Sequence, residues 1–202
     1  MLIVITSEEA IKDEAFKINQ LFEHGLEQLH IRKPFLDFKG YKDLLNKINS
    51  KYYKKIIIHQ YHELVETLDL GGVHLQEQKR LALGNTLKIH VNKFIKKGYK
   101  ITSSFHTKSD LENISVGFSY VFLSPVFDAI SKSNYKGKNF DVSSVNAFVI
   151  GLGGITKLTV YKAYNLGFKG IAILGAVWNT KNFLENFKDV KNSYNKIYQK
   201  LE

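Results

Sequence analysis

Short apolar runs alternate with amphipathic segments from one end of the chain to the other. Each run has the length of one strand and is apolar on both faces, which is typical of strands buried in a parallel sheet. The pattern predicts eight strands, near Leu2–Thr6, Gln28–Arg32, Lys55–His59, Gly72–Leu75, Lys100–Ser103, Tyr120–Leu123, Phe148–Leu152 and Gly170–Leu174.

The segments between these runs repeat apolar residues at the spacing of a helix with one buried face. Helices are predicted at Glu8–Phe22, Leu36–Ile48, Leu81–Gly98, Thr107–Ile114, Thr156–Leu166 and Asn182–Tyr198. With 202 residues, the chain is just long enough for one complete (β/α)8 or TIM barrel of the α/β class. Only two prolines occur and no low-complexity linker divides the chain, so a single domain over residues 1–202 is predicted.

The last two predicted strands end in residues with little or no side chain, at Gly153-Gly154 and at Gly175-Ala176. A backbone without side chains lets N–H groups approach an anion, and the loops after strands 7 and 8 of TIM barrels often form a phosphate site. Tight turns alone would explain one such glycine loop, whereas two in succession favour phosphate binding. The predicted phosphate-binding residues are Gly153, Gly154, Leu174, Gly175 and Ala176.

The remaining strand ends are unusually polar. They carry His30, Arg32, His59, His74, Ser104 and His106, and the loop after the sixth strand adds Ser131 and Lys132. All strands of a TIM barrel deliver their carboxyl ends to one face, so these side chains should surround one cavity. A lone histidine at a strand end is more often structural than catalytic, but four of the seven histidines on one rim favour a site for proton transfer.

Composition removes several classes of function. No cysteine is present, so disulfides, thiolate nucleophiles and thiolate metal sites are excluded. No apolar run approaches the ~20 residues of a membrane span and the N-terminus has no signal pattern, which predicts a cytoplasmic protein without membrane contact. The net charge of +10 would suit nucleic acid, but the lysines are spread over nearly every predicted helix instead of forming one strip. No nucleic-acid partner is therefore expected.

Six segments of the chain resemble, in order, motifs of the thiamine phosphate synthase and TenI superfamily. They are L-I-V-I-T at residue 2, H-I-R-K-P at residue 30, G-G-V-H-L at residue 71, I-T-S-S-F-H at residue 101, Y-V-F-L-S-P-V-F at residue 120 and I-G-L-G-G-I at residue 150. The resemblance covers almost the whole chain. It implies a (β/α)8 barrel of the thiamine pathway, usually a homodimer, that binds a thiazole phosphate on its glycine loops.

Synthases of this superfamily join a pyrimidine methyl diphosphate to the thiazole phosphate and use Mg²⁺ to neutralise the departing pyrophosphate, which requires oxygen ligands. Their Asn-Asp pair after the third strand aligns with His59-Gln60, and their second metal aspartate aligns near Gln78 or Lys79. Both metal carboxylates are thus replaced here. We expect no metal site and no cofactor, and Mg²⁺ only if the chain is a synthase in which Glu77, water and substrate oxygens hold the ion.

TenI proteins show a similar loss, and some isomerise the thiazole carboxylate phosphate without metal. The H-I-R of the second strand resembles TenI, although Pro125 stands where TenI enzymes carry a catalytic histidine. The resemblance therefore implies a TenI-like thiazole phosphate isomerase (tautomerase) or binder, with thiamine phosphate synthase and a non-catalytic regulatory protein as alternatives. The predicted catalytic residues are His59, His106 and Arg32, with His74 as a further candidate base. The predicted substrate-binding residues are His30, Arg32, Ser104, Ser131 and Lys132.

Overall fold

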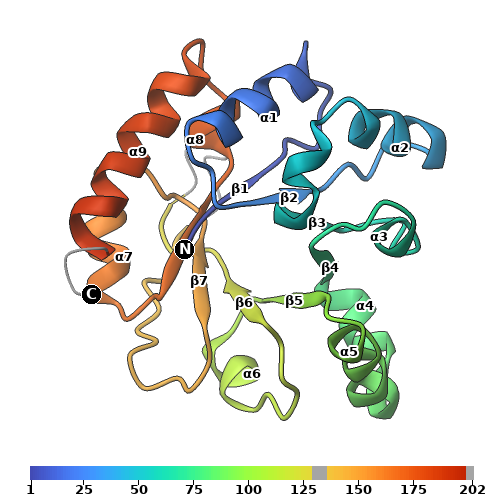
Figure 1. The fold of residues 1–202 in the computed structure, drawn as a ribbon. Coiled ribbons are helices and arrows are strands. Elements are labelled where there is room, and N and C mark those ends of the chain that lie inside the picture. Colours follow the sequence, from blue (N-terminus) through green and yellow to red (C-terminus); the bar gives the residue numbers. More distant parts are fainter. Residues whose placement is uncertain (129–135, 199–202) are drawn as a thin grey trace.

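The computed structural model describes residues 1–128 and 136–198, and its eight strands close into one barrel (Figure 1). The strands are β1 (Leu2–Ile5), β2 (Gln28–Ile31), β3 (Ile56–Ile58), β4 (Gly72–Leu75), β5 (Lys100–Phe105), β6 (Tyr120–Leu123), β7 (Val149–Leu152) and β8 (Gly170–Ile173). All neighbours are parallel, and β8 pairs with β1 to complete the ring. The predicted (β/α)8 barrel is confirmed.

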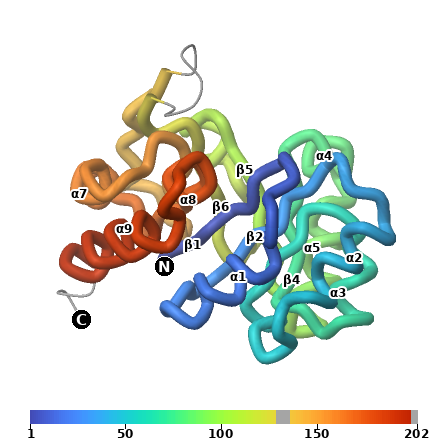
Figure 2. Tube along the Cα trace, turned by 90° about the horizontal axis from the view of Figure 1, so that it is seen from above, coloured from blue at the N-terminus to red at the C-terminus, as the bar shows by residue number. Residues whose placement is uncertain are grey.

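Helices surround the barrel on its outer side (Figures 1 and 2). They are α1 (Glu14–Glu23), α2 (Phe38–Asn46), α3 (Leu64–Thr67), α4 (Glu77–Ala82), α5 (Leu87–Lys96), α6 (Lys108–Glu112), α7 (Val160–Asn165), α8 (Gly175–Trp178) and α9 (Phe183–Tyr198), with 3₁₀ turns at Ser50–Lys55 and Gly84–Thr86. The described residues 136–148, which lead into β7, contain no helix. In the described part of the chain, none of the helices has the length and apolar character needed to cross a membrane.

Two predicted helices have different bounds in the structure. The helix predicted to start at Glu8 starts at Glu14, because residues 8 and 9 line the barrel cavity and Asp13 adopts a left-handed conformation with φ of 55°. The segment Leu81–Gly98, predicted to hold one helix, contains α5 and also the last two residues of α4. Gly84 separates the two helices at φ of 45°, a left-handed conformation that glycine adopts without steric cost.

The barrel interior is apolar on one side and polar on the other. Alternate residues of a strand point to opposite faces, so the outward residues of the strands pack against the helices. The inward apolar cluster comes from β1, β6, β7 and β8 and consists of Ile3, Ile5, Tyr120, Phe122, Ile150 and Ala172. The inward positions of β2, β4 and β5 instead carry buried polar side chains, among them Gln28, His30, His74 and Thr102. TIM-barrel interiors are usually filled by branched apolar residues, so the polar half needs another explanation.

Helix side chains anchor the strand ends that carry the cavity. The Tyr41 hydroxyl of α2 donates to the Ile31 carbonyl at 2.7 Å, and the Trp178 indole of α8 donates to the Ile5 carbonyl at 2.7 Å. Both bonds are buried. The Ile31 carbonyl also accepts from the His59 N–H at 3.1 Å, so the tyrosine is its second donor. Both side-chain bonds fix the strand ends and the first residues of the loops that follow.

A buried ion pair ties the loop after β1 to the loop after β2. Lys33 is 2% exposed, and its ammonium contacts the Glu14 carboxylate and the Glu9 carbonyl, each at 2.7 Å. Burial raises the pKa of Glu14, although the hydrogen bond and charge of Lys33 oppose that shift. The pair holds residues 8–14 in place and thereby forms one side of the cavity.

Replacing Glu14 should therefore cost more stability than replacing a carboxylate in an exposed pair. Glu14→Gln leaves the Lys33 ammonium buried without a counter-charge, and we expect a loss of ~3 kcal/mol in the free energy of unfolding. Asp189→Asn is the control, because Asp189 pairs with Lys157 at 2.6 Å on the surface and its loss should cost below ~1 kcal/mol. Urea unfolding followed by Trp178 fluorescence measures both, and equal losses would contradict this account.

Candidate active site

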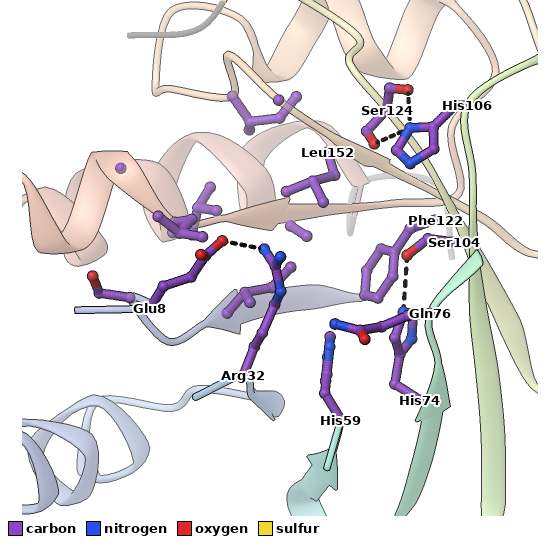
Figure 3. A pocket seen from close by; sticks show the side chains of 18 of the residues that line it. Glu8, Arg32, His59, His74, Gln76, Ser104, His106, Phe122, Ser124 and Leu152 are labelled. Carbon is purple, nitrogen blue, oxygen red and sulfur yellow. Dashed lines mark hydrogen bonds and ion pairs between the residues drawn. The ribbon is translucent and has the colours of Figure 1, made fainter. Parts of the chain in front are cut away.

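A cavity of about 820 Å³ lies at the carboxyl ends of the strands (Figure 3). Residues from the ends of β1 to β8 line it, so side chains far apart in the sequence share one space. Nine of the residues that the sequence predicted for the site line this cavity, together with His74, the further candidate base. They are Arg32, His59, Ser104, His106, Gly153, Gly154, Leu174, Gly175 and Ala176.

Arg32 follows β2 and is held by its backbone. The Thr6 hydroxyl accepts from the Arg32 N–H at 2.8 Å and donates to the Arg32 carbonyl at 3.1 Å. The guanidinium forms an ion pair with Glu8 at 2.6 Å, drawn as a dashed line in Figure 3. Both side chains are about one third exposed, so an anionic ligand can compete with Glu8 for the guanidinium.

The glycine loops after β7 and β8 present free backbone donors to the cavity. Gly153 and Gly154 have φ of 99° and 65°, and within the described residues neither N–H donates a hydrogen bond. The same holds for Gly175 and Ala176, at the start of α8. A Cβ on Gly154 would lie 2.5 Å from the Asp128 carbonyl oxygen, so only glycine fits there. Free N–H groups on two neighbouring loops suit an anion with several oxygens.

Three buried histidines, which we call the histidine trio, lie below the cavity in the polar half of the barrel. They are His30, His59 and His74. The His30 Nδ1 lies 3.0 Å from the His59 Nε2, and the His30 Nε2 lies 2.6 Å from the Tyr120 hydroxyl. The rings of His59 and His74 stack with centroids 4.1 Å apart, and Figure 3 shows both rising from the ends of β3 and β4.

The trio is electrically neutral. Burial lowers the pKa of His74 to about 3 and lowers the pKa of His30 and His59 well below the ordinary value for histidine. The neighbouring imidazoles reinforce this for His30 and His59, since each charged ring would repel the others. A base with so low a pKa accepts a proton poorly near neutral pH, so the trio is a weak choice for proton abstraction.

His106 follows β5 and differs from the trio because its side chain is 42% exposed. Its Nδ1 lies 3.0 Å from the Ser124 carbonyl oxygen and 3.2 Å from the Ser124 hydroxyl. A carbonyl oxygen can only accept, so the Nδ1 carries a proton and donates it. The Nε2 is then the basic nitrogen, and it lies 4.0 Å from the Glu77 carboxylate, which also lines the cavity.

Comparisons with known proteins agree with this geometry. Residues 2–177 match the family model described as thiamine monophosphate synthase. The chain belongs to the thiamine monophosphate synthase family. A thiamine-phosphate synthase of Dictyoglomus turgidum is 21% identical over 184 residues, which cover 86% of this chain and 79% of that protein. The resemblance to the thiamine phosphate synthase and TenI superfamily is thereby confirmed.

Solved structures support the same fold and family. A crystal structure of thiamine phosphate pyrophosphorylase from Bacteroides thetaiotaomicron shares 28% identity, with a TM-score of 0.72 and 95% and 96% of the two chains covered. The thiamine phosphate pyrophosphorylase from Pyrococcus furiosus has a TM-score of 0.78 at 20% identity, with 97% and 96% covered, and shows the fold alone.

The Mg²⁺ that this family's synthases use does not fit the described residues. Mg²⁺ prefers carboxylate and water oxygens in octahedral geometry. Glu8 is engaged with Arg32, and Glu77 faces Arg80 at 3.4 Å. Where the described part of the chain brings three potential ligands together, all three are imidazoles. The described residues of the cavity therefore offer hydrogen-bond donors and imidazoles, and their carboxylates do not come together as a group of three.

Of the predicted substrate-binding residues with a described position, His30 is not among those that line the cavity. His30 is fully buried, because its ring fills the barrel interior and bonds to His59 and Tyr120, so it reaches the cavity only through His59. Ser131 and Lys132 lie outside the described residues. The sequence analysis also missed cavity residues, namely Glu8, Glu9, Gln76 and Phe122. Glu8 was assigned to a helix, and Phe122 reads as ordinary strand core, so neither carried a separate signal.

The tight fit of Gly154 in its loop gives a testable prediction about stability. Gly154→Ala combines a left-handed φ with the close Asp128 carbonyl, so we expect a loss of about 2 to 3 kcal/mol in the free energy of unfolding. Gly98→Ala is the matched control, since its φ is 79° but no atom lies within 4 Å, and about 1 kcal/mol is expected. Urea unfolding compares the two variants. Similar losses would show that the loops are not closely packed.

Proposed function

We propose that this chain acts in thiamine biosynthesis on a thiazole phosphate and isomerises its ring as TenI proteins do. The observation that carries the proposal is the position of His106. Its ring is held against Ser124, the residue immediately before Pro125. By the resemblance described above, TenI enzymes have their catalytic histidine at the position of Pro125. In this chain His106, which follows β5, brings an imidazole next to the residue before Pro125, and this contact supports the proposal.

The proposed site divides the ligand between two sides of the cavity. The free N–H groups of Gly153, Gly154 and Gly175 bind the phosphate, and Arg32 orients the carboxylate by exchanging its ion pair with Glu8 for the ligand. The Nε2 of His106 takes a proton from one ring position and returns it at another. The Ser124 carbonyl keeps the imidazole in the tautomer that this transfer needs.

The names of the relatives favour a second candidate, the coupling reaction of a thiamine-phosphate synthase. That reaction releases pyrophosphate, whose charge must be neutralised as it departs. The described cavity offers Glu77 for a magnesium ion, assisted by water and substrate oxygens. The coupling and the isomerisation share the phosphate loops and differ in whether Mg²⁺ and a pyrimidine diphosphate are needed.

Substitution of His106 tests the isomerase proposal. His106→Asn keeps a side chain that can bond to Ser124 but removes the base, so turnover of the thiazole tautomer should fall by ~10² to 10⁴. The affinity for the thiazole phosphate and the urea midpoint should change little. His24→Asn is the control, because His24 bonds to Gln20 on α1 and does not line the cavity. Full turnover by His106→Asn would make the assignment wrong.

A coupling assay separates the two candidates. The wild-type protein is given the thiazole phosphate and the pyrimidine methyl diphosphate, with and without millimolar Mg²⁺. The isomerase proposal predicts tautomer conversion in both conditions and no coupled product. Product formed only with Mg²⁺ would assign the synthase reaction, and ligand binding with neither product would assign a non-catalytic binding role.

A further inference from the structure

The histidine trio has the composition of a metal site, although the sequence analysis expected none. His30, His59 and His74 come from three adjacent strands, and each is at most 3% exposed. One ring nitrogen from each lies within 4.8 Å of the other two. Burying three imidazoles in a barrel interior costs free energy unless each ring nitrogen has a partner. The partners of these nitrogens therefore indicate what the cluster is for.

Hydrogen bonding inside the protein does not satisfy the whole cluster. The His59 Nδ1 is buried and has no partner among the described residues. The His59 Nε2 lies 3.0 Å from the His30 Nδ1. One of these two nitrogens donates a proton to the other, so the contact is a single hydrogen bond between the two rings. Two nitrogens bound to one tetrahedral zinc ion at about 2.05 Å lie about 3.3 Å apart. The separation seen here therefore suits a shared ion with little movement of either ring.

The outer ring nitrogens of His30 and His74 have the hydrogen-bond partners that metal-bound imidazoles usually have, whereas the outer His59 Nδ1 has none among the described residues. The His30 Nε2 lies 2.6 Å from the Tyr120 hydroxyl. His74 has the Thr102 hydroxyl at 2.8 Å from its Nδ1 and the Ser104 hydroxyl at 2.8 Å from its Nε2. On metal binding, His74 exchanges one of these hydroxyls for the ion and keeps the other. Such outer hydrogen bonds set the ring orientation and the tautomer of the ligands.

The chemistry of the three donors selects the class of ion. Neutral imidazoles suit zinc and the later first-row transition metals, whereas magnesium and calcium require oxygen ligands. All three rings are buried, and an apolar interior favours the neutral imidazole, which is the form that binds a metal ion. Because His59 and His74 also line the cavity, a fourth ligand can come from that side.

We propose that His30, His59 and His74 bind one divalent transition-metal ion of the zinc class through one ring nitrogen each, with the fourth position open to the cavity. An anion completes the site, because three neutral ligands leave the charge of the ion uncompensated and Arg32 adds a further positive charge nearby. This site is separate from the His106 base, so its existence does not depend on the proposed isomerase activity.

The test is titration of the tag-free, metal-stripped wild-type protein with Zn²⁺ against a chromophoric chelator, and with Co²⁺ followed by visible absorption. We expect one equivalent of Zn²⁺ with a submicromolar dissociation constant. We also expect the intense absorption of tetrahedral Co²⁺, changed by added phosphate at the open position. No stoichiometric binding, or a Co²⁺ spectrum of octahedral type, would overturn the proposal and leave a hydrogen-bonded cluster.

Variants assign the ligands. His59→Asn and His74→Asn should each weaken Zn²⁺ binding by at least ~100-fold. His24→Asn, on the outer surface of α1, should leave the affinity unchanged. Circular dichroism checks that each variant is folded, and if either fails to fold, the wild-type Co²⁺ spectrum alone decides. Unchanged affinity in folded His59→Asn or His74→Asn would overturn the proposal.

Discussion

The structure depends on satisfying polar side chains inside a closed barrel. Water does not reach the interior freely, so a buried polar group without a hydrogen-bond partner lowers the free energy of unfolding by about 1 to 3 kcal/mol. The barrel meets most of this constraint with a chain of bonds from Tyr120 through His30 to His59, and with a second group in which His74 bridges two hydroxyls. The His59 Nδ1 is left without a partner among the described residues. The bond between His30 and Tyr120 joins β2 to β6 across the barrel interior, although these two strands are not neighbours in the sheet.

This constraint also divides the cavity into two kinds of surface. On the apolar side, the loops after β7 and β8 carry glycines whose N–H groups donate no hydrogen bond among the described residues, which suits a phosphate. On the polar side, buried imidazoles lie beneath a rim that carries Arg32 and His106. A phosphorylated heterocycle with a second anionic group would match both sides. The rim histidine is partly exposed to the cavity, whereas burial lowers the pKa of the three histidines beneath it and makes them poor proton acceptors.

The sequence predicts the barrel well because apolar runs and helical spacing are repeated signals along the whole chain. It also identifies the glycine loops, since Gly153, Gly154 and Gly175 stand where strands end. It does not separate His30 from His106, because residue type and position along a strand do not reveal depth. His30 lies inside the barrel, whereas His106 is the first residue after β5 and is partly exposed. Long-range pairs such as Arg32 with Glu8 also leave no local pattern.

The most direct test of the account is a structure of the wild-type protein with the thiazole carboxylate phosphate bound. The account predicts phosphate oxygens about 3 Å from the backbone nitrogens of Gly153, Gly154 and Gly175. It also predicts the ligand ring beside the Nε2 of His106, with the Arg32 guanidinium turned from Glu8 to the carboxylate. A phosphate bound elsewhere on the rim, or a ring remote from His106, would contradict it.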